Sequence, residues 1–141
     1  MGAFASAEEF RKVMDRTFEL MSTDAEMGPK LRDAQTPQRF EFPDLDLVVN
    51  INAADEVEGG QHLRWEWSDA VGWEPEVEMI MDSEVANRYF QGKENVAVAL
   101  ARRRIKSKGN VKKALALIPI TKPVFARYRE MLERDYPHLL A

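Results

Sequence analysis

The stretch from residue 92 to residue 119 constrains the fold more than any other part of the chain. A short apolar run at 96–100 leads into a strand-like segment at 102–108. Gly109 and Asn110 then stop the strand, because glycine readily adopts left-handed backbone and asparagine is a good N-cap for a following helix. The apolar positions of that helix are Val111, Leu115 and Ile118. The pattern predicts a late strand between two helices.

Period-two alternation predicts the other strands. Residues 62–68 place Leu63, Trp65 and Trp67 on one face of a strand and charged side chains on the other. Residues 39–53 predict one strand or two short ones, bent near Pro43, and Gly59-Gly60 predicts a hairpin turn. We expect the sheet to be formed by segments near 39–53, 62–68, 71–74, 76–82 and 102–109.

Capping patterns and helical spacing predict the helices. Ser6 and Glu9 form a capping box before an apolar face that contains Phe10, Met14, Phe18 and Met21. Asp82 or Ser83 caps a later helix, and residues 24–34 predict a short helix that Gly28-Pro29 either interrupts or starts. We expect helices near 7–21, 83–91, 95–101, 110–118 and 123–135.

The order of these elements predicts the fold class. A helix precedes a meander of strands, and one late strand returns between helices, which is typical of an α+β arrangement. We expect residues 1–141 to form a single domain with a mostly antiparallel five-stranded sheet. The 141 residues are enough for a sizeable core, and no repeat or linker divides them.

The pattern resembles the sterol-carrier-protein type of lipid-binding domain. The resemblance rests on the block Met79-Ile-Met-Asp-Ser-Glu-Val85, the Gly92-Lys93 turn and the 102–110 strand, and it runs from about Leu45 to Leu117. It implies helices packed on one face of the sheet and an apolar tunnel between the two layers. Residues 96–100 lack the glutamine of many eukaryotic members, and the long final helix is similar to stand-alone bacterial members.

Nothing in the sequence specifies an enzyme. The chain has no cysteine, and its two histidines, His62 and His138, have no partner at metal-ligand spacing. Glu76, Glu78 and Asp82 share a strand face, which is more often solvated than functional. We expect no catalytic residue, no metal and no cofactor, and a non-catalytic protein.

Charge is unevenly distributed along the chain. Residues 1–94 contain 9 Lys and Arg against 21 Asp and Glu, whereas residues 95–141 contain 11 against 3. The 102–113 basic stretch could weakly contact an anionic membrane or the phosphates of an acyl-CoA, or the two halves could neutralise each other across the fold. The stretch has no interleaved aromatic residue and the sequence pI is about 5.3, so we expect no nucleic-acid partner.

The resemblance implies that the protein binds and carries a lipophilic ligand: a fatty acid, an acyl-CoA, an isoprenoid or a sterol-like lipid. The alternative is an accessory module that presents a lipophilic intermediate to a partner enzyme. We expect the ligand-binding wall to contain Trp65, Trp67, Met79, Met81, Phe90, Val96, Leu100, Leu115, Phe125, Tyr128 and Leu132.

The remaining expectations concern location. No basic region followed by an apolar core begins the chain, so a cytoplasmic protein is expected. The Met1–Ser6 segment fits the loose pattern for N-myristoylation, which is short enough to arise by chance. No sequence feature specifies an oligomeric state.

Overall fold

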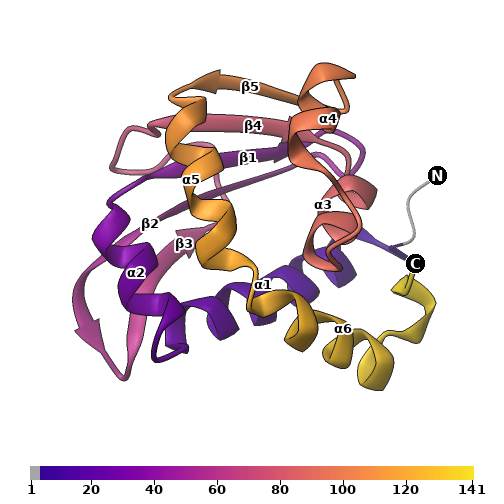
Figure 1. The fold of residues 1–141 in the computed structure, drawn as a ribbon, viewed down its shortest axis with the longest axis horizontal. Helices are drawn as coiled ribbons and strands as arrows, with labels where there is room; N and C mark the ends of the chain where they lie inside the picture. Colours follow the sequence, from indigo (N-terminus) through magenta and orange to yellow (C-terminus); the bar gives the residue numbers. More distant parts are fainter. Residues whose placement is uncertain (1–3) are drawn as a thin grey trace.

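Five strands form one sheet in the computed structural model, which describes residues 4–141 (Figure 1). They are β1 (Gln38–Phe42), β2 (Leu47–Glu58), β3 (Gln61–Glu66), β4 (Val77–Met81) and β5 (Ile105–Gly109). Their order is β3-β2-β1-β4-β5, and β1 and β4 run parallel while the other neighbours are antiparallel. The expected α+β class with a mostly antiparallel sheet is confirmed.

The helices confirm the sequence prediction with small changes at their ends. They are α1 (Ala7–Thr23), α2 (Met27–Ala34), α3 (Ser83–Phe90), α4 (Val96–Ala101), α5 (Val111–Thr121) and α6 (Val124–Asp135), followed by the 3-10 turn η1 (Pro137–Leu139). Figure 1 shows α5 crossing in front of the strands. Within residues 4–141, no helix has the length and apolar character to cross a membrane. The possible acylation pattern begins at Gly2, which lies outside the described residues.

Two predicted strands have different bounds in the structure. The 39–53 segment is two strands, β1 and β2, joined by a turn in which Asp46 has a positive φ of 54°. The 102–109 strand begins only at Ile105, because Arg103 has a φ of 59° and the amide of Arg104 still bonds to the Ala99 carbonyl at the end of α4.

The expected strand at 71–74 is wrong, because that segment forms irregular structure. Instead of pairing, Trp73 packs against β3, where the Arg64 guanidinium lies over the indole ring, 4.7 Å from its centroid. Pro75 follows at once and has no amide hydrogen to donate to a neighbouring strand.

Local geometry explains two of the connections. Gly59 and Gly60 have φ values of +60° and +79°, which a two-residue hairpin turn of type I′ requires at both positions. The start of α3 is stabilised from a distance, because the Ser83 amide and hydroxyl donate to the two oxygens of Asp44, at 2.9 and 2.6 Å. Asp44 lies in the β1–β2 turn, so this contact joins the turn to the helix that follows β4.

Asp24 connects three helices. One of its oxygens accepts hydrogen bonds from the Met27 and Glu26 amides at 2.8 and 2.9 Å, so it satisfies free amides at the start of α2. The other lies 3.3 Å from Arg127 of α6. The hydrogen bonds from Met27 and Glu26, aided by Arg127, lower the pKa of Asp24 despite the opposing effect of burial.

Replacement of this carboxylate should therefore destabilise the fold in a pH-dependent way. We expect Asp24→Ala to lower the free energy of unfolding by about 1 kcal/mol at neutral pH, the usual cost of losing a helix cap. A carboxylate whose pKa is lower in the folded state stabilises the fold at pH values above its unfolded-state pKa. This stabilisation is lost as pH falls through the folded-state pKa. The difference from wild type should shrink as pH falls below 3.8, the ordinary pKa.

Urea unfolding followed by circular dichroism across this pH range measures the effect. Asp33→Ala is the matched control, because Asp33 is an exposed aspartate on α2 itself. An equal loss in both variants, or a loss that does not change with pH, would contradict this role of Asp24.

Candidate functional site

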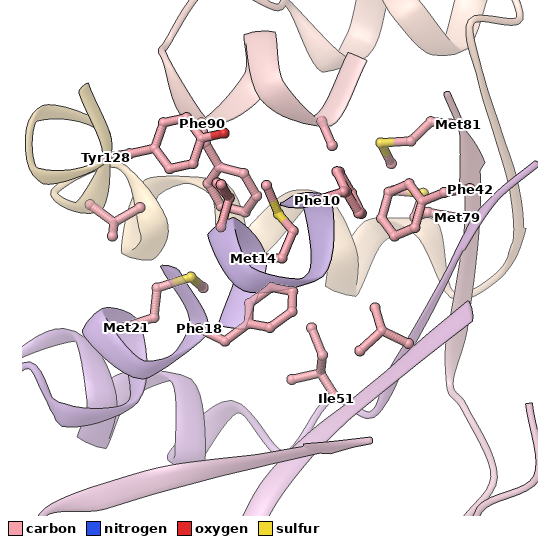
Figure 2. Close-up of a cluster of buried hydrophobic side chains, with 14 of the residues drawn as sticks. Phe10, Met14, Phe18, Met21, Phe42, Ile51, Met79, Met81, Phe90 and Tyr128 are labelled. Atoms are coloured by element: carbon pink, nitrogen blue, oxygen red, sulfur yellow. The ribbon is translucent and has the colours of Figure 1, made fainter. Parts of the chain in front are cut away.

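An apolar cavity lies between the sheet and the helices. Its volume is about 110 Å³, and apolar side chains form nearly all of its wall. The sheet contributes Phe40, Phe42, Ile51, Met79, Met81 and Ile105. The helices contribute Met14, Phe18, Met21, Phe90, Val96 and Leu117 among others. Figure 2 shows Met14 and Phe18 of α1 opposite Met79 and Ile51 of the sheet.

Few polar groups reach this cavity. Thr36, Gln38, Asn52, Tyr89 and Thr121 also line it. Burial raises the pKa of Tyr89 to about 12, although a hydrogen bond with Thr121 opposes the shift, so the phenol is neutral at physiological pH. A largely apolar wall with a few polar groups is the usual construction of a site for a lipophilic molecule.

The structure brings four of the eleven predicted wall residues to this cavity. They are Met79 and Met81 on β4, Phe90 on α3 and Val96 on α4. The other seven, which lie outside the cavity lining, are Trp65, Trp67, Leu100, Leu115, Phe125, Tyr128 and Leu132.

The helical residues among these seven lie outside the cavity for one of two reasons. Either they occupy a different position around their helix, or their helix packs behind the residues that line the cavity. On α5 the lining positions are Ala114, Leu117, Ile118 and Thr121, whereas Leu115 lies beside them. Tyr128 and Leu132 of α6 are fully buried one layer further out, and the Tyr128 ring lies 5.4 Å from that of Phe90. These residues therefore support the cavity wall.

Trp65 and Trp67 face α1 and are bound there by one carboxylate. Both indole N–H groups donate to the same oxygen of Asp15, at 3.0 and 2.6 Å. Phe18 packs against both rings, with centroid distances of 5.6 and 6.3 Å. This contact attaches α1 to the edge strand β3, and we refer to it as the Asp15 clamp.

Sequence reasoning missed the contribution of α1 to the cavity. The spacing of Met14, Phe18 and Met21 predicted a buried face, but periodicity alone does not show which buried positions border an empty space. Four of the seven methionines of the chain line the cavity: Met14, Met21, Met79 and Met81. That shared composition is the sequence signal that could have identified the α1 residues.

A buried hydrogen-bond network stabilises the wall behind Phe90. The Tyr128 hydroxyl donates to Asn87 Oδ1 at 2.6 Å, and Asn87 Nδ2 donates to the Leu139 carbonyl at 2.8 Å. Gln91 Nε2 donates to the same carbonyl at 3.1 Å. The network fixes η1 against α3, and burial raises the pKa of Tyr128 above its ordinary range.

The candidate catalytic side chains take part in structural contacts. His62 Nδ1 lies 2.9 Å from the Ser22 carbonyl, which requires the proton on that nitrogen, and His138 Nε2 lies 3.0 Å from Glu9. Glu76, the residue before β4, pairs with Lys113 of α5 at 2.9 Å. Among residues 4–141, no group of three or more His, Asp or Glu side chains could hold a metal ion.

Comparison with known proteins identifies the fold. By sequence, the chain matches no protein-family model and no curated protein. By structure, it is similar to the sterol carrier protein domain 2 of Helicoverpa armigera, with a TM-score of 0.62 and 22% identity over 89% of this chain and 97% of that one. It is also similar to the ubiquinone synthesis protein UbiJ-SCP2, with a TM-score of 0.61 and 5% identity over 82% and 89%.

A third similarity is to part of a larger enzyme, the sec-alkylsulfatase Pisa1 from Pseudomonas sp. The TM-score is 0.60 with 15% identity over 76% of this chain, but the chain spans only 16% of the length of that enzyme. The chain thus has the sterol carrier protein fold, and the resemblance seen in the sequence is confirmed at the level of the fold.

The Asp15 clamp provides a test of how the two tryptophans act. We expect Asp15→Ala to lower the free energy of unfolding by about 1–3 kcal/mol, because two half-buried N–H groups lose their acceptor. Asp15→Asn keeps an oxygen at the position and should lose less. Urea unfolding monitored by tryptophan fluorescence measures both variants, and identical stability in the three proteins would show that the clamp does not stabilise the fold.

Proposed function

We propose that this protein binds a lipophilic small molecule in the cavity between sheet and helices and carries it without chemical turnover. The observation that supports the proposal is the nearly continuous apolar wall of that cavity, in a chain with the sterol carrier protein fold. The ligand class is a fatty acid, an acyl-CoA, an isoprenoid or a sterol-like lipid. The wall residues proposed to contact it are Met79, Met81, Phe90 and Val96, together with Met14, Met21 and Leu117.

A long-chain ligand requires the cavity to expand. An engineered protein cavity of about 150 Å³ binds molecules as small as benzene or xenon, and this cavity has about 110 Å³. The four methionines of the lining supply the adaptability, because their side chains are unbranched and rearrange at low energetic cost. Each methylene transferred from water to the cavity contributes about 0.8 kcal/mol, so a fatty chain supplies enough free energy to drive such a rearrangement.

The carrier is proposed to act in the cytoplasm, with a weak and reversible contact between the 102–113 stretch and an anionic membrane. Two of its basic residues are engaged within the fold, because Arg104 pairs with Glu94 and Lys113 pairs with Glu76, both at 2.9 Å. These pairs join the basic half of the chain to the acidic half. The membrane contact would therefore depend on the exposed basic residues that these pairs leave, which are Arg102, Arg103, Lys106, Lys108 and Lys112.

An escort for a partner enzyme is the second candidate. The fold is about equally similar to the insect sterol carrier domain and to UbiJ-SCP2, with TM-scores of 0.62 and 0.61, so fold alone does not separate the two roles. A carrier should transfer a fluorescent fatty acid between vesicles unaided. An escort should transfer it poorly and release it only to a co-purifying enzyme.

Filling the cavity tests the proposal directly. Ala114 of α5 is buried in the cavity wall, and Ala116, two positions further on, is exposed. We expect Ala114→Phe to reduce the affinity for a fluorescent fatty acid at least tenfold, because the ring occupies the space that the ligand needs. Ala116→Phe is the matched control and should bind as the wild type does.

Fluorescence titration measures the affinities, and native mass spectrometry of the purified protein detects a lipid that co-purifies. Circular dichroism and the thermal midpoint establish that both variants are folded. Equal affinity in both variants, with folding intact, would place the ligand outside this cavity and contradict the proposed site.

A further inference from the structure

A second hollow adjoins the cavity where β4 ends, α3 begins and β5 starts. It has a volume of about 490 Å³ and contains the side chains of four cationic residues: Arg88, Arg103, Arg104 and Lys106. Three acidic residues, Asp82, Glu84 and Glu94, also line it. We refer to this hollow as the cationic groove, because its lining carries more basic than acidic side chains.

Glu94 organises two of the four cations. Its side chain is only 2% exposed, and one carboxylate oxygen accepts from Arg104 Nε and lies 2.9 Å from Arg104 Nη2. The other oxygen lies 3.4 Å from Arg88 Nε. The buried charge is thereby matched, and both guanidinium groups are fixed at the groove while their remaining N–H groups stay available.

The other two cations are not matched within the fold. Among residues 4–141, no carboxylate lies within ion-pair distance of Arg103 or Lys106. Arg103 also has a left-handed backbone, with a φ of 59°, which is unfavourable for a residue with a long side chain. The turn from α4 into β5 therefore directs an unpaired guanidinium to this place despite a conformational cost.

Within the described part of the chain, residues 4–141, Met81 is the one residue that borders both the groove and the apolar cavity. Its neighbours alternate between the two spaces. On β5, which pairs with β4, Ile105 lines the cavity and Lys106 lines the groove. On α3, Ala86 lines the cavity and Val85 lines the groove. The apolar space and the cationic one thus meet at a flexible methionine at the end of β4.

We infer that the ligand of this protein is an anionic amphiphile, whose phosphate or carboxylate head binds in the cationic groove while its chain passes Met81 into the cavity. The inference rests on the proposed function and specifies its ligand class. Arg103 and Lys106 bind the head, and Arg88 and Arg104 contribute through the N–H groups that Glu94 leaves available. Guanidinium groups suit this role, because their planar donors match the oxygens of a phosphate or carboxylate.

Two probes with the same chain but different heads test the inference. Dodecyl phosphate and 1-dodecanol, both kept monomeric, are titrated against the full-length protein by competition with a fluorescent fatty alcohol. We expect the phosphate to bind about tenfold more tightly than the alcohol, and raised salt to reduce only the phosphate affinity. Inorganic phosphate alone should compete poorly, because it has no chain to enter the cavity.

Matched double variants locate the head. Arg103→Gln with Lys106→Gln should weaken dodecyl phosphate about tenfold and leave 1-dodecanol unchanged. Lys30→Gln with Lys122→Gln removes the same charge from exposed positions outside the groove and should leave both affinities at the wild-type value. All four residues are on the surface, and circular dichroism checks that both variants are folded.

The possible results separate this inference from the proposed function. If both probes bind the wild type equally, or if the two double variants lose equal affinity for dodecyl phosphate, the groove does not bind the head and the inference is overturned. The inference is also overturned if inorganic phosphate competes with the fluorescent fatty alcohol as well as dodecyl phosphate does, since the groove would then be a site for free phosphate. If neither probe binds the wild type, the proposed function fails as well.

Discussion

The parallel pairing of β1 with β4 is the constraint on which the rest of the structure depends. It places Phe40 beside Met79 on the inner face, although many residues separate them in sequence. The chain must leave the edge strand β3 and return to the centre of the sheet, and it does so over the outer face. There Asn50 donates to the Ser68 carbonyl and Arg39 to that of Asp69. The inner face is left for helices alone, which is why one continuous apolar space can form there.

The two sides of that space differ in rigidity. On one side, Phe90 packs against Tyr128, whose hydroxyl is hydrogen-bonded to Asn87 within a fully buried network. Buried polar networks of this kind hold side chains in one arrangement. On the other side, the methionines of α1 and β4 adapt their shape readily. The proposed ligand would therefore displace the wall formed by Met14, Met79 and Met81 (Figure 2), and Met81 also borders the cationic groove.

Local patterns predicted most of the elements, because alternation, caps and helical spacing are properties of neighbouring residues. They did not predict the partner of β4, since a parallel pair leaves no short-range signal. They also did not distinguish residues that line the cavity from residues that pack in the filled core. Leu115 and Leu117 both fit an apolar helix face, and only the packing of α5 against the sheet brings Leu117 to the cavity. The cap on α3 comes from Asp44 through the tertiary structure, and no reading of residues 82–85 could have identified it.

An empty apolar space also has an energetic consequence. At about 24 cal/mol per Å³, a cavity of about 110 Å³ lowers stability by roughly 2–3 kcal/mol. Larger side chains at positions such as Ala114 would recover that free energy and remove the space. Contacts outside the cavity offset the loss instead: the Asp15 clamp holds α1 on β3, and the Asn87 network holds η1 on α3. The stabilising contacts thus surround the cavity, and a bound chain would add the packing that the empty wall lacks.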